Sequence, residues 1–144
     1  MSARRRDGHL RFLDHTADVL AECEAPDFAG LLEVAARALY ETALETYRGG
    51  AAPDARRMAR IEGGSYEEIL VRWLQELLYL LDVERFVAIR FRFDEASGAR
   101  LRAVVDGYVH GPDERAVEVK AATYHGMEVR RDAEGFRARV VFDL

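Results

Sequence analysis

The chain has 144 residues, of which 49% are apolar and 33% are charged, and its formal net charge is −5. This length and balance are those of one globular domain, and they exclude a disordered chain or a set of independent domains. A single cysteine excludes an internal disulfide and any multi-cysteine metal site, and the negative charge argues against a broad basic surface for nucleic acid.

The N-terminal residues 1–8 are basic, and no long apolar stretch follows them. Apolar runs elsewhere fall far short of the roughly 20 residues needed to cross a bilayer. We therefore expect a cytoplasmic protein without a membrane segment, with residues 1–8 as a flexible basic tail and residues 9–144 as the folded domain.

Residues 8–25 predict two short strands, because apolar and polar residues alternate on both sides of the acidic segment 14–18. Cys23 lies within this alternation. The pattern therefore favours a small packing residue on a strand over a cysteine nucleophile.

The first helix is predicted at residues 27–47, where apolar residues recur at helical spacing. Pro26 and Asp27 supply the start signal, since proline and an N-cap aspartate both favour the first turn of a helix. A glycine pair and Pro53 then mark a loop before a strand at residues 57–62.

The second helix begins after Ser65, which has the capping-box spacing to Glu68, and a wide apolar stripe runs from there to Leu81. Leucines with one tryptophan, Trp73, at this spacing indicate a buried core and not a cofactor box. The rest of the chain predicts strands at residues 86–93, 101–109, 117–121, 123–130 and 136–143.

These elements predict a single α+β domain with a mainly antiparallel or mixed sheet of about seven or eight strands. The two long amphipathic helices are expected to pack mainly on one face of that sheet. No glycine-rich segment matches a Walker or dinucleotide-binding loop, which argues against nucleotide binding by a standard motif.

Acidic residues near both chain ends are the candidates for chemistry. Asp14 and Asp18 share one face if the chain between them is extended, although two aspartates near a turn also serve as cap and turn residues. The final strand ends in Asp143 and the terminal carboxylate of Leu144. Three such carboxylates brought together would repel by about 4 kcal/mol per pair at 4 Å and an effective dielectric of 20, which a hard cation would relieve.

Ligation by oxygen alone favours calcium or magnesium, whereas added histidines shift the preference toward manganese, zinc or iron. His15 and His125 lie in suitable contexts, but the pattern favours a hydrogen-bonded structural histidine over a metal ligand for each. Whether the two chain ends converge is not determined by the sequence.

Four segments together resemble the archease family, in the family's order and across essentially the whole chain. They are Phe12–Asp18, Leu70–Asp82, Val119–Val129 and Ala138–Leu144. The resemblance implies the archease fold. It also implies a non-catalytic accessory protein of the GTP-dependent RNA ligase of tRNA splicing and RNA repair, which promotes guanylylation and multiple turnover of the ligase. RNA would then be reached only through the ligase.

The resemblance further implies a divalent metal, described for the family as calcium, with magnesium or manganese as alternatives. Carried over by position, the ligands fall on Asp18, Asp143 and the terminal Leu144. Asp14, His15 and His125 would have supporting roles. The chain departs from the family pattern at Val19-Leu20 and at residues 26–30, outside the implied ligands.

Two other classes of function are also compatible with these residues. One is a small metal-dependent hydrolase or phosphotransferase that uses the Asp18 and Asp143 cluster, with His15 or His125 as general base. The other is a general chaperone or interaction module without obligatory metal, which predicts an exposed apolar patch.

Overall fold

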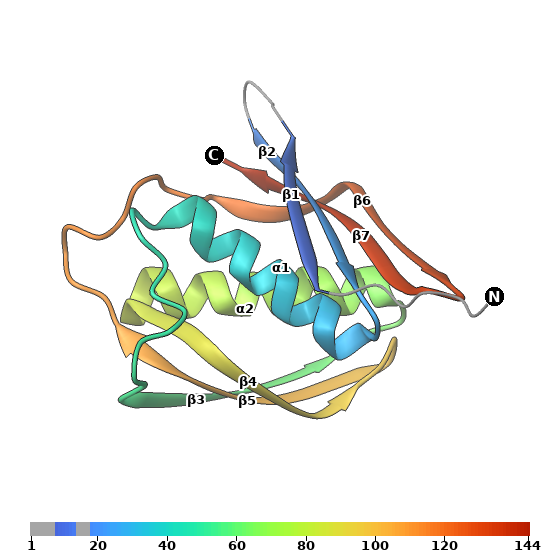
Figure 1. Cartoon of the computed structure of the whole chain (residues 1–144), viewed down its shortest axis with the longest axis horizontal. Coiled ribbons are helices and arrows are strands. Elements are labelled where there is room, and N and C mark those ends of the chain that lie inside the picture. The colour runs from blue at the N-terminus through green and yellow to red at the C-terminus, as the bar shows by residue number, and fades with distance from the viewer. Residues whose placement is uncertain (1–7, 14–17) are drawn as a thin grey trace.

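The computed structural model describes residues 8–13 and 18–144, which form three layers: a sheet, a pair of helices and a second sheet (Figure 1). One sheet has four strands in the order β1-β2-β7-β6 and the other has three in the order β3-β5-β4, and all of the strand pairs are antiparallel. The elements are β1 (His9–Leu13), β2 (Asp18–Ala25), α1 (Phe28–Ala43), β3 (Ala55–Glu62), α2 (Tyr66–Glu84), β4 (Phe86–Ala96), β5 (Arg100–Val109), β6 (Ala121–Asp132) and β7 (Gly135–Asp143).

Both predicted helix starts are confirmed by their caps. The Asp27 carboxylate accepts a hydrogen bond of 2.7 Å from the Gly30 amide, and the Ser65 hydroxyl accepts one of 3.1 Å from the Glu68 amide. α1 ends at Ala43, earlier than expected, because the Ala43 carbonyl accepts a hydrogen bond of 2.8 Å from a distant amide, that of Ala116. This long-range contact is not visible in the local apolar pattern.

The core lies between the two sheets and is centred on the helices. Trp73 is fully buried, and its indole Nε1 donates a hydrogen bond of 2.9 Å to the Leu32 carbonyl of α1. Its ring also packs edge-on against Phe91 and Phe93 of β4. The predicted core role of Trp73 is therefore confirmed, because this one side chain joins both helices to the three-stranded sheet.

Cys23 is completely buried on β2, and desolvation of the thiolate raises the pKa of its thiol to about 12. The thiol therefore stays protonated at neutral pH. This confirms the packing role that the alternating pattern predicts.

The separate strand predicted at residues 117–121 is wrong, because only Ala121 of that range belongs to a strand, as the first residue of β6. Val119 is buried from an irregular segment. Its burial accounts for the apolar character of the segment without strand pairing.

The predicted α+β class, strand number and antiparallel pairing are confirmed. The single sheet that was expected is wrong, because the strands form two sheets with the helices between them. The helices bury residues around most of their circumference and so cover one face of each sheet. No helix within residues 8–13 and 18–144 is long and apolar enough to span a membrane. Of the predicted tail, only Gly8 lies within the described residues.

Candidate functional site

The two aspartates expected to bind metal lie directly opposite each other at one end of the four-stranded sheet. Asp18 is the first residue of β2 and Asp143 the last of β7, and the antiparallel register pairs them. Successive residues of a strand point to opposite faces, and Ala21 and Cys23 are buried against the helices. Asp18 and Asp143 therefore lie on the outer face of the sheet, Asp18 partly buried and Asp143 exposed.

The chain end is held beside this pair. The Lys120 amide donates a hydrogen bond of 2.8 Å to the Asp143 carbonyl, and Ala121 of β6 pairs with Asp143 on the side of β7 away from β2. Leu144 follows directly after this anchored strand.

Two carboxylates directly opposite each other on a sheet repel, since their Cβ atoms are about 4.5–5.5 Å apart. Their oxygen donors, together with the terminal carboxylate, fit a hard cation such as Ca²⁺. Ca²⁺ takes six to eight oxygen ligands, so water would complete its shell. In the described part of the chain, no three His, Cys, Asp or Glu side chains form a metal-binding group. Asp14 and His15 lie outside that part.

The segment that carries His125 is a bulge in β6. Thr123 pairs with Val141, but the next pair is Glu128 with Arg139, so β6 contains three more residues than β7 across this interval. Gly126 has a φ of +77°, in the left-handed region. A glycine within a strand pattern is a sequence signal for such a bulge, which the strand predicted at 123–130 did not include.

His125 itself is exposed, and its backbone amide donates a hydrogen bond of 3.1 Å to the Thr123 hydroxyl. Asp143 pairs with Ala121, four residues before His125 along β6. The register therefore does not place His125 opposite the aspartate pair, and its supporting role stays a prediction.

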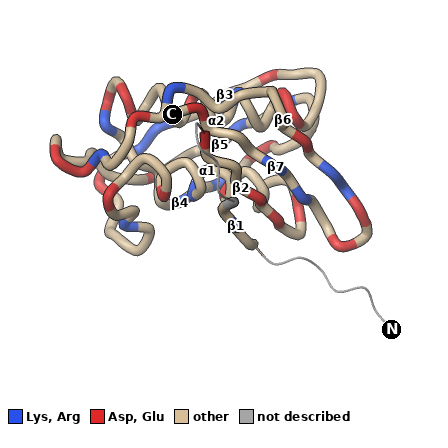
Figure 2. The backbone as a smooth tube through the Cα atoms, turned by 90° about the horizontal axis from the view of Figure 1, so that it is seen from above, with Lys and Arg blue, Asp and Glu red and all other residues tan. Residues whose placement is uncertain are grey.

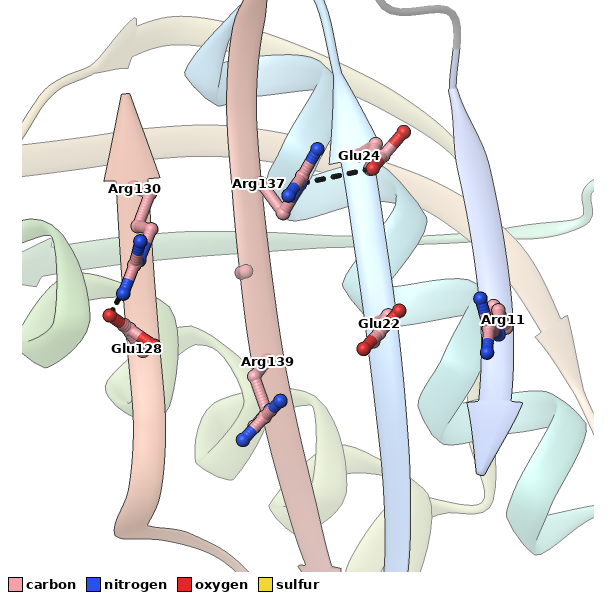
Figure 3. A pocket seen from close by; sticks show the side chains of 8 residues that line it. Arg11, Glu22, Glu24, Glu128, Arg130, Arg137 and Arg139 are labelled. Carbon is pink, nitrogen blue, oxygen red and sulfur yellow. Dashed lines mark hydrogen bonds and ion pairs between the residues drawn. The ribbon is translucent and has the colours of Figure 1, made fainter. Parts of the chain in front are cut away.

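A charged hollow lies farther along the same outer face (Figure 3). Figure 2 shows acidic and basic residues interspersed along β6 and β7. Two ion pairs line the hollow. Arg137 of β7 pairs with Glu24 of β2 at 3.1 Å, and Arg130 pairs with Glu128 along β6 at 2.7 Å. The side chains that line it are those of Arg11, Glu22, Glu24, Glu128, Arg130, Arg137 and Arg139, with Ala138 between them.

Sequence reasoning did not find this hollow. The sequence does contain a signal for it. Glu22 and Glu24 are two residues apart, as are Arg137 and Arg139, and residues two apart on a strand lie on the same face. The antiparallel register of β2 with β7 then brings the two pairs together.

Comparison with known proteins gives consistent matches over nearly the whole chain. The model of the Archease protein family (MTH1598/TM1083) matches residues 10–144. A protein archease from Archaeoglobus fulgidus is 35% identical over 136 residues, which are 93% of this chain and 98% of that protein. A protein archease from Methanosarcina acetivorans is 31% identical over 139 residues, which are 92% of this chain and 94% of that protein.

Solved structures agree with these matches. The solution structure of protein 1598 from Methanobacterium thermoautotrophicum has a TM-score of 0.74 and 28% identity, covering 94% of this chain and 98% of that one. A crystal structure from Thermotoga maritima, described as an archease and possible chaperone, has a TM-score of 0.62 at 21% identity and covers all of both chains. It supports the fold. The family model and the relatives together show that this chain belongs to the archease family.

Proposed function

We propose that this chain is a non-catalytic, metal-binding accessory protein of the GTP-dependent RNA ligase of tRNA splicing and RNA repair. It promotes guanylylation and multiple turnover of the ligase, and RNA is joined by the ligase alone. Membership of the archease family supports this proposal, as does the description of the Thermotoga maritima relative as a possible chaperone.

The observation that carries the proposal is the opposition of Asp18 and Asp143 beside the chain end. These two carboxylates and the terminal carboxylate of Leu144 would hold a divalent cation, with Ca²⁺ preferred and Mg²⁺ or Mn²⁺ as alternatives. A bound cation would neutralise the repulsion between the carboxylates. The chain itself contributes the anchored strand ends that keep the donors together on the outer face.

The proposed effect on the ligase is differential binding. An accessory protein shifts an equilibrium between two states of its partner only by the difference in its affinities for them. A tenfold preference for the nucleotide-accepting state is worth about 1.4 kcal/mol. Equal affinity for both states would give no stimulation, however tight the complex.

The test is ligase guanylylation and multiple-turnover RNA joining with the wild-type chain, Asp18→Asn, Asp143→Asn and a matched control, Asp94→Asn. Asp94 is an exposed strand aspartate on the other sheet. The two site variants are expected to lose stimulation of the ligase while remaining folded, and the control to retain it. Full stimulation by Asp18→Asn and Asp143→Asn would overturn the metal-dependent mechanism. Turnover of a phosphate ester by the isolated chain would instead favour the hypothesis of a hydrolase or phosphotransferase.

A second candidate function is an interaction module that needs no metal. Tyr79 and Val83 lie one turn apart on α2 and are 54% and 62% exposed, so they form an apolar strip on the surface. This module predicts that stimulation of the ligase is unchanged by chelators and is reduced by Tyr79→Ala with Val83→Ala. The same double substitution leaves the calcium response intact under the first proposal.

A further inference from the structure

The outer face of the three-stranded sheet is rich in arginine. Its other face is covered by the helices, and no helix or strand of the described chain lies on the outer side (Figure 1). Buried residues such as Ala59, Ile61 and Val105 point inward, so the alternate residues point outward. The outward arginines are Arg56 and Arg60 on β3, Arg100 and Arg102 on β5, and Arg90 and Arg92 on β4.

This face has a different charge balance from the rest of the molecule. Its six arginines are accompanied by four carboxylates, those of Glu62, Asp94, Glu95 and Asp106. The other described residues include twelve Arg and Lys but twenty Asp and Glu, among them Asp54 at the rim beside Arg56. A polyanion is therefore repelled by most of the surface and least by this face.

Several of these arginines form no ion pair, although the register places Arg100 opposite Glu62 and Arg90 opposite Asp106. Asp106 lies between Arg56 and Arg90 in the sheet, but it accepts two hydrogen bonds from Arg56, at 2.7 and 3.2 Å. These bonds hold the pKa of the Asp106 carboxyl below its usual range. Within the described residues, Arg60, Arg90 and Arg100 form no ion pair.

The strand register also places like charges together. Arg60 lies directly opposite Arg102, and like charges in this position destabilise a sheet. The acidic neighbour of Arg102 is Glu95, and their ion pair is long, at 3.9 Å. Arg60, Arg100 and Arg102 line one shallow hollow together with Glu62 and Glu95. An anion placed between the guanidinium groups would relieve their repulsion.

The composition of the face distinguishes between classes of polyanion. A protein partner normally requires an apolar interface core with few charges. Here the outward apolar side chains are Met58 and its neighbour Val104, of which Val104 is only 6% exposed. Guanidinium groups, in contrast, match phosphate oxygens with two parallel hydrogen bonds.

The aromatic residues of β4 do not contribute to this face. Phe91 and Phe93 point inward and contact Trp73. Base stacking on exposed aromatic rings is therefore not provided by this sheet, and sequence-independent binding through phosphates is what the face supports.

We propose that the outer face of the three-stranded sheet binds the phosphate backbone of a single nucleic-acid strand, with Arg60, Arg90 and Arg100 as the contact residues. This goes beyond the proposed function, in which RNA is reached only through the ligase, and it does not depend on the metal site. The net charge of −5 argues against a broad basic surface and not against a local one.

The test is fluorescence anisotropy of a labelled single-stranded oligoribonucleotide with the isolated full chain, over a range of salt concentrations. Three phosphate contacts on a single strand give a slope of about −2 in log K against log salt, since each contributes roughly −0.7. Arg60→Ala with Arg100→Ala should reduce the slope to about −0.7 and weaken binding at least about tenfold at low salt. Circular dichroism of each variant establishes that it is folded.

The matched control is Arg139→Ala, an exposed arginine on the outer face of the other sheet that also forms no ion pair within the described residues. It is expected to leave the affinity and the salt slope unchanged. The proposal is overturned by the absence of binding at low salt, or by an equal loss of affinity in the control. Displacement of the RNA by polyglutamate at the same charge concentration would also overturn it, in favour of an acidic protein partner.

Discussion

Asp18 and Asp143 form a directly opposed cross-strand pair at the point where β2 begins and β7 ends. The pair brings the start of β2 and the end of β7 together on one face of the four-stranded sheet. Its repulsion depends on whether a cation is present, so one substitution should have opposite effects on stability in the two conditions.

Asp143→Asn removes one charge of this pair. Without divalent ions, it should raise the free energy of unfolding by up to about 1 kcal/mol, the range for cross-strand charge pairs. With Ca²⁺ at a hundredfold excess over its dissociation constant, the wild-type chain should gain about 2.7 kcal/mol and the variant much less. Urea unfolding followed by circular dichroism, with Ca²⁺ and with chelator, measures both effects. A Ca²⁺ response that is equal in wild type and variant would place the cation elsewhere.

Gly107 of β5 lies against the backbone of β4, where an added Cβ would overlap the carbonyl oxygen of Val87. Backbone cannot move aside as a flexible side chain does, so Gly107→Ala should cost about 3 kcal/mol or more. Gly50→Ala is the matched control, because nothing lies within 4 Å of its Cβ position. That control should change stability by no more than about 1 kcal/mol. Similar midpoints for the two variants in urea unfolding would show that the strands can separate at low cost.

Gly126 of the β6 bulge has a φ of +77°, and an added Cβ would make only an ordinary contact of 3.5 Å with Val141. The expected cost of Gly126→Ala is therefore conformational, about 1–2 kcal/mol. Gly126→Asn should cost less, since asparagine tolerates the left-handed region better. Thermal unfolding of the two variants separates the explanations, because a purely steric origin predicts that the larger asparagine is the worse of the two.

Cys23 makes stability depend on pH in the alkaline range. The folded-state pKa is raised to about 12 from 9.0, so the protonated thiol is the form that the fold favours. Its contribution is fully present below pH 9 and is lost as the pH rises toward 12, at about 1.4 kcal/mol per unit. Cys23→Ala should remove the part of this pH dependence of the free energy of unfolding that comes from the thiol. The part that comes from other groups, such as the buried Tyr40, should remain.

The measurement is the difference in the free energy of unfolding between the wild-type chain and Cys23→Ala at pH 8 and pH 10.5, in a reducing buffer. The wild-type advantage should shrink as the pH rises. An unchanged difference, or rapid labelling of the native thiol by a disulfide reagent at pH 8, would contradict a deeply buried thiol.

Much of the fold could be predicted from local pattern. The Ser65 cap and the apolar stripe that includes Trp73 identify α2, because helix capping and periodicity depend on residues close in sequence. The segment at 117–121 shows the opposite case. Val119 is apolar because it is buried from an irregular segment, and apolar character alone does not distinguish a strand from a buried connection.

The candidate site likewise has one part that follows from the sequence and another that depends on the fold. The positions of the charged residues, including Asp18, Asp143 and the many arginines, are read directly from the amino-acid sequence. The family resemblance indicates which of them to expect at a metal. The pairing of β2 with β7, which places Asp18 opposite Asp143, is seen only in the folded protein, as is the position of Arg60 opposite Arg102 on a separate sheet. Strand register and the division into two sheets depend on how all of the apolar faces pack around the two helices. This packing joins residues far apart in the sequence, so no short segment encodes it.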